Sequence, residues 1–315
     1  MSERSDVGFS IERAKRRGGR ALSEPLALLV TGAKGQLGRD VVEQAKGLGH
    51  RVTAVGSAEL DISEAKAVDA AVAAMAGGFR AVVINCAAHT AVDAAETEPE
   101  AAAAVNAAGP AHLAGACVRH GVHLVHVSTD YVFAGDAAAP YEPGDATGPR
   151  SVYGRTKLEG ERAVLAALPS AHVVRTAWVY GAHGTNFVST MLRLERERDT
   201  VRVVDDQQGS PTWTGDLATG LLELAARDDV DGGVLHATNS GATTWYGLAR
   251  AVFNAAGADP ARVQPCRTEE FPRPAPRPAY SVLSNAAWIA AGLTPLRPWR
   301  AALDHAIAGG TFGAR

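Results

Sequence analysis

The chain has 315 residues, of which 46% are hydrophobic and 21% charged, with a formal net charge of −3. This length can bury one large core or two smaller ones, and the charge gives no reason to expect nucleic acid or an anionic membrane as a partner. No apolar run reaches the roughly 18 residues of a membrane span. The scattered cysteines, Cys86, Cys117 and Cys266, fit a reducing cytoplasm and argue against a disulfide framework. We therefore expect a cytoplasmic globular protein.

The N-terminal segment is polar and carries a basic cluster between Arg13 and Arg20. It lacks the apolar segment of a secretory signal. We predict that residues 1–25 form a disordered basic tail outside the fold.

A glycine-rich turn follows the first apolar run. Residues 26–30 are typical of a buried parallel strand. Gly32, Gly35 and Gly38 come next, and residues 39–45 continue with a helical pattern. Glycines let a pyrophosphate approach the backbone, and the helix N-terminus supplies N–H donors and partial positive charge. The spacing of these glycines differs from the commoner Gly-x-Gly-x-x-Gly. An ordinary loop is the alternative interpretation. The position of the turn between a strand and a helix favours dinucleotide binding.

The second predicted strand, residues 51–55, ends at Gly56 and Ser57. An NAD-selective site usually has an acid here, which binds the ribose 2′-OH. With no acid to repel a 2′-phosphate, we expect NADPH as the cofactor, with NADH possible. Ser57 can donate a hydrogen bond to a 2′-phosphate, and Lys34 or Arg51 is a candidate cation beside it.

Two further strands end in residues suited to a ligand site. Residues 81–88 run into small side chains, which leave room for a flat ligand at the carboxyl end of the sheet. Residues 124–127 lead into Ser128 and Thr129, whose hydroxyls can bond a substrate carbonyl oxygen or simply cap a turn. His89 is a lone loop histidine, to which the residue pattern alone assigns no chemistry.

Tyr153 and Lys157 are four residues apart on a predicted helix, so both side chains lie on one face. A free phenol has a pKa near ~10, and a fixed ammonium nearby is expected to lower it. Such a pair can give a proton to a carbonyl oxygen or take one from an alcohol. The alternative is a half-buried ring beside a solvated lysine, because this spacing is common.

These residues together resemble a known family. The chain resembles the dTDP-4-dehydrorhamnose reductases, which are extended short-chain dehydrogenase/reductases. The resemblance rests on residues 32–38, 85–93, 128–133, 153–161, 175–181, 186–194, 206–212 and 277–281. It implies an α/β fold with a Rossmann-type doubly wound parallel sheet and a smaller C-terminal substrate-binding lobe. We expect the nucleotide domain at residues 26–180, with later segments returning to it, and the sugar-nucleotide lobe mainly at 181–315.

The resemblance also implies roles for individual residues. The catalytic residues would be Thr129, Tyr153 and Lys157. The cofactor would contact Gly32, Gly35, Gln36, Leu37, Asp61, Ile62, Ala88, His89, Thr90, Tyr153 and Lys157. The sugar nucleotide would contact Val92, Thr129, Asp130, Tyr153 and Trp178.

A proline-rich stretch at residues 271–278 contains Arg273 and Arg277. Alternating prolines suit a stiff linker. Arginine also suits phosphate geometry, so Arg277 is a candidate ligand of the substrate pyrophosphate.

The implied reaction reduces a dTDP-4-keto-6-deoxy-L-sugar, chiefly dTDP-4-dehydro-L-rhamnose to dTDP-L-rhamnose. The alternatives are a sister reductase of the dihydrostreptose or 6-deoxytalose branch and a non-catalytic regulatory subunit, and intact Tyr153 and Lys157 argue against the second. Some relatives hold magnesium through glutamates at a dimer contact. Asp40 and Gly215 occupy the matching positions here, so we predict no metal, while a homodimer is possible.

Overall fold

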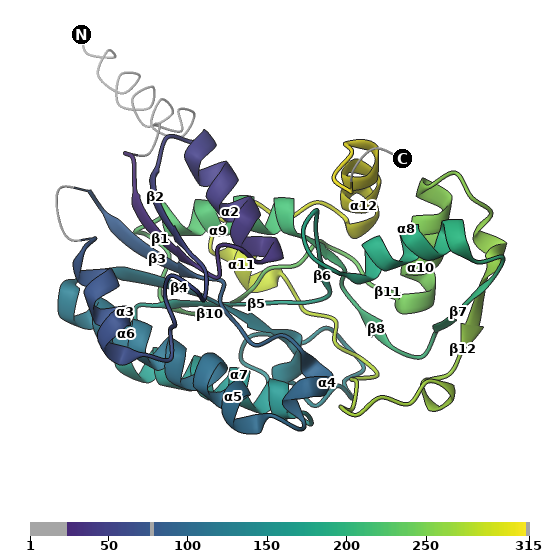
Figure 1. The fold of residues 1–315 in the computed structure, drawn as a ribbon, viewed down its shortest axis with the longest axis horizontal. Coiled ribbons are helices and arrows are strands. Elements are labelled where there is room, and N and C mark those ends of the chain that lie inside the picture. Colours follow the sequence, from purple (N-terminus) through teal and green to yellow (C-terminus); the bar gives the residue numbers. More distant parts are fainter. Residues whose placement is uncertain (1–23, 76–78, 313–315) are drawn as a thin grey trace, which may run out of the picture.

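The computed structural model describes residues 24–75 and 79–312, so the predicted tail lies outside the described residues except at its last two positions. A six-stranded sheet forms the centre (Figure 1), in the order β2-β1-β3-β4-β5-β10. Every neighbouring pair is parallel. The strands are β1 Ala27–Thr31, β2 Arg51–Val55, β3 Ala81–Asn85, β4 His123–Thr129, β5 His172–Thr176 and β10 Gly233–His236.

The strand order determines where a ligand can bind. From β1 the chain crosses to β2 on one side, then returns to β3 and proceeds through β4 and β5 on the other. The resulting switch point lies between β1 and β3, and open parallel sheets bind ligands in the crevice outside the strand ends at such a point. The predicted doubly wound parallel fold is therefore confirmed.

Helices cover both faces of the sheet (Figure 1). One face packs against α2 Gln36–Gly47, α9 Thr214–Ala225 and α11 Ala286–Ala290. The other face packs against α3 Ala65–Ala73, α6 Gly109–His120 and α7 Val152–Ala167. The strands are rich in Val, Leu and Ile because both of their faces are buried.

One helical stretch, Pro99–His120, is long and apolar enough to cross a membrane by length and composition. It consists of α5 Pro99–Ala103, a π-helical turn at Ala104–Ala108 and α6. Leu113, Ala114 and Cys117 are buried against the sheet. This packing is that of a core helix in a globular domain.

A second core belongs to the C-terminal part of the chain, at the right of Figure 1. Its main helices are α8 Phe187–Glu197, α10 Trp245–Ala255 and α12 Trp299–Ala308, with Val188, Leu248 and Leu303 buried among them. The short strands are β6 Val179–Tyr180, β7 Val201–Val204, β8 Gln208–Gly209, β9 Thr212–Trp213, β11 Thr243–Thr244 and β12 Val263–Cys266. From residues 181–315, β10 joins the sheet and α9 and α11 pack on its face, so these segments return to the nucleotide domain.

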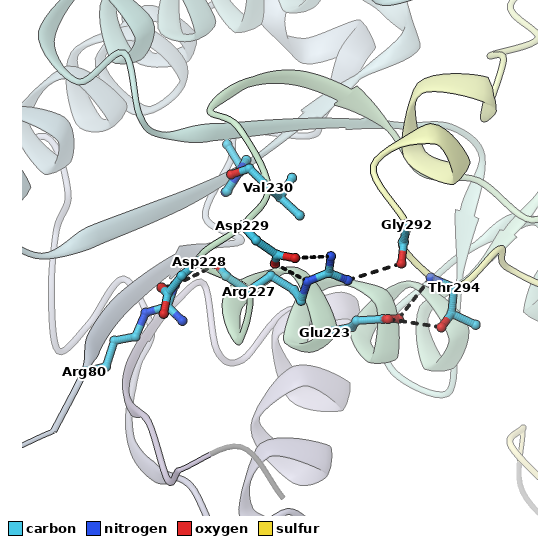
Figure 2. Close-up of polar contacts among 9 residues, drawn as sticks. Arg80, Glu223, Arg227, Asp228, Asp229, Val230, Gly292 and Thr294 are labelled. Atoms are coloured by element: carbon cyan, nitrogen blue, oxygen red, sulfur yellow. Dashed lines mark hydrogen bonds and ion pairs between the residues drawn. The ribbon is translucent and has the colours of Figure 1, made fainter. Parts of the chain in front are cut away.

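A polar network holds this returning segment in place (Figure 2). Arg227, just after α9, donates to Asp229 Oδ2 at 2.9 Å and to the Gly292 carbonyl at 3.2 Å. Arg80, just before β3, donates to the Arg227 carbonyl at 2.8 Å and pairs with Asp228 at 2.6 Å. The network thus joins the end of α9 to the start of a central strand and to the turn after α11.

Helix α7 is attached to β5 by a buried ion pair. Arg175 donates to Glu161 from Nε at 2.9 Å and from Nη2 at 2.7 Å. The two side chains are only 4% and 2% exposed. Charges taken out of water are tolerated only with close, well-oriented partners, and this forked geometry supplies them.

Glu161→Gln should leave the Arg175 guanidinium buried without a counter-charge. We expect a loss of about 3–5 kcal/mol in unfolding free energy, measured by urea denaturation. Glu197→Gln removes one partner of the exposed pair Arg193–Glu197 and serves as the control, with an expected loss below about 0.5 kcal/mol. Equal losses in the two variants would contradict the role of the buried pair.

Candidate active site

A cavity of about 630 Å³ opens at the carboxyl ends of the strands. Its wall comes from the turns after β1 and β2, the loops after β3, β4 and β5, helix α7, and Trp245 at the start of α10. The volume lies within the usual range of small-molecule sites, roughly 300–1,000 Å³.

The glycine turn forms one end of the cavity. Gly32 has φ +64°, and a Cβ there would lie 2.6 Å from the Ala87 nitrogen, so only glycine fits. Helix α2 starts at Gln36 with Gly35 as its N-cap and without a side-chain cap. The predicted residues Gly32, Gly35, Gln36 and Leu37 all line the cavity. Uncapped N–H groups and the helix dipole suit a pyrophosphate at this end.

Most of the other residues assigned to the cofactor also line the cavity, namely Asp61, Ile62, Ala88 and Thr90. His89 is outside that set. Asn106 holds its backbone, accepting from the His89 N–H at 2.8 Å and donating to its carbonyl at 3.1 Å. The His89 ring lies 3.8 Å from Glu98 Oε2. Its ring Nδ1 is buried without a hydrogen-bond partner among the described residues, and contact with the cofactor stays a prediction.

An acidic side chain, Glu59, lies beside Gly56 at the end of β2. Glu59 Oε2 accepts a hydrogen bond from the Gly56 N–H at 3.0 Å. Its other oxygen pairs with Lys34 Nζ. The expectation of no acid beside Gly56 was wrong because the turn after β2 folds Glu59 back over the strand end.

Thr129, Tyr153 and Lys157 meet in the middle of the cavity wall. Thr129 ends β4, and its Oγ1 accepts from the Tyr131 N–H at 3.2 Å and donates to Asp130 Oδ1 at 3.0 Å. Tyr153 lies in the first turn of α7, and the nearby Thr129 side chain acts to lower the pKa of its hydroxyl. Lys157 Nζ donates to the Val127 carbonyl at 2.7 Å.

The protonation states follow from burial. Desolvation raises the pKa of Tyr153 to about 12, against a smaller opposing effect of Thr129. Burial lowers the pKa of Lys157 to about 8, and nearby Glu161 opposes this shift. The expectation that Lys157 lowers the Tyr153 pKa was wrong here, because desolvation dominates and the ammonium is bound to a backbone carbonyl. A neutral phenol at physiological pH is the form that can donate a proton.

Close contacts position α7. A Cβ on Gly154 would lie 2.2 Å from the Tyr131 carbonyl oxygen, and one on Gly160 would lie 2.1 Å from the Asn106 carbonyl oxygen. Asn106, in the π-helical turn, also donates to Thr156 Oγ1 at 3.2 Å. The helix therefore lies flush against its neighbours, so the Tyr153 side chain is held at a fixed position.

Of the residues assigned to the sugar nucleotide, Val92, Asp130 and Trp178 line the cavity. Arg277 does not. Its guanidinium donates to Asp93 Oδ2 at 3.0 Å and to the Ala275 carbonyl at 3.0 Å. Arg277 thus ties the proline-rich loop to α4 Val92–Ala95, and a role on the substrate pyrophosphate stays a prediction.

Three buried polar atoms in the cavity wall lack a protein partner: Ser128 Oγ, Asp130 Oδ2 and Thr176 Oγ1. Buried polar groups are normally hydrogen-bonded, so these three atoms are exceptions within the wall of this cavity. A sugar with its hydroxyls, or a carboxamide, fits this set. Thr176 was missed in the sequence, although its place at the end of β5 is the signal that identified Thr129.

One face of the Trp178 ring is covered by a second indole. Trp245 stacks on Trp178 with ring centroids 3.5 Å apart and planes 4° apart. A Cβ on Gly209 would lie 2.4 Å from the Trp178 ring. Trp178 also has φ +47°, the only positive value among the non-glycine residues of the described chain. Trp245 reaches the cavity wall from α10 of the C-terminal lobe, and no local pattern around it indicated this position.

The predicted absence of a metal depends on Asp40 and Gly215. Burial raises the pKa of Asp40, and nearby Thr214 opposes this shift. The Gly215 carbonyl accepts from Gln44 Nε2 at 2.8 Å. In residues 24–75 and 79–312, no group of three or more His, Cys, Asp or Glu side chains could hold a metal ion, and metal independence stays a prediction.

The parallel sheet, the open helix N-terminus and the Thr129–Tyr153–Lys157 group define an oxidoreductase of the short-chain dehydrogenase/reductase class. The RmlD substrate binding domain family matches residues 26–311. The chain belongs to this family, that of the dTDP-4-dehydrorhamnose reductases, as the sequence resemblance indicated.

Individual relatives agree with this assignment. A dTDP-4-dehydrorhamnose reductase of Streptomyces griseus is 55% identical over 283 residues, which cover 89% of this chain and 92% of the relative. A probable dTDP-4,6-dihydroxy-2-methyloxan-3-one 4-ketoreductase of Streptomyces antibioticus is 52% identical over 280 residues, covering 89% and 94%.

Two crystal structures share the fold. A dTDP-4-dehydrorhamnose reductase of Clostridium acetobutylicum is 44% identical, with a TM-score of 0.84. A Bacillus anthracis dTDP-4-dehydrorhamnose reductase in complex with NADP is 35% identical, with a TM-score of 0.84. Both comparisons cover 89% of this chain and 98% of the other.

Asp130→Asn should stabilise the folded protein at neutral pH. Burial raises the pKa of Asp130 to about 6 from a usual 3.8, so above pH 6 folding carries the cost of a buried carboxylate. Removing it should raise the unfolding free energy by on the order of 1–3 kcal/mol. Below about pH 4 the carboxyl is protonated in both states, so the gain should fade between pH 6 and pH 4.

Urea unfolding of both proteins across this pH range tests the prediction. Asp199→Asn, at an exposed acid, is the control and should show no such pH dependence. A gain that persists unchanged at pH 4 would show that the effect comes from packing instead of charge.

Proposed function

We propose that the protein reduces dTDP-4-dehydro-L-rhamnose to dTDP-L-rhamnose with NADPH, accepting NADH as well, in the cytoplasm. The observation that carries the proposal is that Tyr153, Thr129 and Lys157 line one cavity with the uncapped N-terminus of α2. The reductases of this name at 55% and 44% identity support the substrate, and the NADP complex of the relative at 35% identity supports the cofactor.

Each residue of the proposed catalytic group has a separate role in the reaction. The bound dihydronicotinamide supplies the hydride. The Thr129 hydroxyl orients the sugar carbonyl, and Tyr153 gives its proton to the carbonyl oxygen as negative charge develops there. Lys157, held by the Val127 carbonyl, places a positive charge beneath the site. The open start of α2 and the unpaired Ser128, Asp130 and Thr176 atoms hold the polar parts of the two ligands.

A sister reduction is the second candidate. The Streptomyces antibioticus relative, at 52% identity, has a name that describes 4-keto reduction of a different dTDP-linked sugar. Reductions in the dihydrostreptose and 6-deoxytalose branches are sister reductions of the same kind. A regulatory subunit would not need the Tyr153 and Lys157 arrangement. Two copies of the chain forming a homodimer would be compatible with each of these functions.

Purified protein should consume NADPH with dTDP-4-dehydro-L-rhamnose, and NMR of the product should show the L-rhamno configuration. Tyr153→Phe removes the proton donor and should lower kcat by about 10²–10⁴-fold, while the dissociation constant for NADPH changes little. Tyr246→Phe, on a tyrosine outside the cavity wall, is the matched control and should retain full activity. Wild-type turnover in Tyr153→Phe would refute the mechanism, and a different product configuration would favour the sister reduction.

A further inference from the structure

The turn after β2 carries an acidic side chain in contact with two hydrogen-bond donors. Gly56 and Ser57 end the strand and line the cavity, together with Lys34 from the glycine turn. The Glu59 carboxylate bridges Gly56 and Lys34. One oxygen accepts from the Gly56 N–H at 3.0 Å, and the other pairs with Lys34 Nζ. A Cβ on Gly56 would lie 2.9 Å from Lys34 Cδ and 3.1 Å from Glu59 Oε2, so the three groups are closely packed.

The cluster lies at the end of the second strand, where this class of fold places the ribose of the cofactor. In sheets of this class, the end of the second strand faces the ribose of the adenosine, and a carboxylate there bonds the 2′-OH. A 2′-phosphate at the same place needs N–H donors and a cation. The Gly56 N–H and the Lys34 ammonium are such donors, and Glu59 occupies both of them.

A carboxylate and a phosphate therefore compete for the same partners. Both Lys34 and Gly56 lower the pKa of Glu59, so it is ionised at neutral pH. A 2′-phosphate must displace the carboxylate from both donors and meets its negative charge. A free 2′-OH can instead donate a hydrogen bond to the same carboxylate.

We propose that Glu59 is a specificity-determining residue that reduces the preference for NADPH, because it holds Lys34 and the Gly56 N–H that a 2′-phosphate would use. This inference rests on the proposed use of a nicotinamide dinucleotide, but not on the identity of the sugar. It predicts that one site accepts both cofactors. The Lys34 and Glu59 side chains are 63% and 45% exposed, so both can move when a phosphate enters.

Binding measurements separate this role from that of an ordinary surface ion pair. The ligands are adenosine 2′,5′-bisphosphate and NADP⁺, compared with AMP and NAD⁺, by isothermal titration calorimetry. Glu59→Gln should tighten binding of the two 2′-phosphorylated ligands about tenfold, which is about 1.4 kcal/mol, and change AMP and NAD⁺ by less than about threefold. Glu64→Gln removes the same charge from the exposed N-cap of α3, outside the cavity wall, and should leave all four constants unchanged.

Lys34 provides the second arm of the experiment. Lys34→Gln should weaken the 2′-phosphorylated ligands about tenfold, and adding Glu59→Gln to it should restore little, because the competition requires Lys34. Thermal melting of each variant checks that it is folded. Equal effects of Glu59→Gln on phosphorylated and non-phosphorylated ligands, or no effect on either, would overturn the role of Glu59. Failure of the wild-type protein to bind any of the four ligands would instead overturn the proposed function itself, and this inference with it.

Discussion

The buried contact between Arg175 and Glu161 fixes the geometry on which the site depends. One guanidinium binds the carboxylate of α7, donates to the Pro143 carbonyl at 3.3 Å and lies 4.9 Å from the centre of the Phe133 ring. It thereby joins the catalytic helix, strand β5 and the loop after β4. Because Thr176 and Trp178 follow Arg175 directly, the same anchor sets the position of two residues of the cavity wall. Glu161 also lies one turn after Lys157 and raises the pKa of that lysine against the effect of burial.

Burial controls the chemistry of the site more than any single pair of charges does. Desolvation keeps the Tyr153 phenol protonated and raises the Asp130 pKa to about 6. Ser128, Asp130 and Thr176 leave polar atoms unpaired, which costs stability in the free protein. A ligand that supplies those hydrogen bonds recovers this cost. The wall of the cavity therefore contains polar groups that lower the unfolding free energy of the free protein.

Much of this arrangement could be predicted from the sequence, because it depends on local patterns. The strand, glycine turn and helix around Gly35, and the hydroxyl at the end of β4, are set by residues close together in the chain. The same holds for the four-residue spacing of Tyr153 and Lys157. The parallel sheet follows from the alternation of apolar strands with helices.

The features that escaped prediction are contacts between distant residues. Glu59 reaches Lys34 across 25 positions, and Arg277 reaches Asp93 across 184. Trp245 meets Trp178 from another lobe. The direction of the Tyr153 pKa shift could not be foreseen either, since it depends on how deeply the fold buries the phenol. No local pattern encodes such distances or burial.

The contact between Gly209 and Trp178 has a consequence for engineering the sugar pocket. Any side chain at position 209 would collide with the indole, and Trp245 covers one face of the ring. The three positions therefore form one steric unit, although they lie on separate segments of the chain. Libraries that randomise Trp178 alone would leave most of the new space unused, whereas joint variation with Gly209 and Trp245 could reshape the pocket for bulkier sugars.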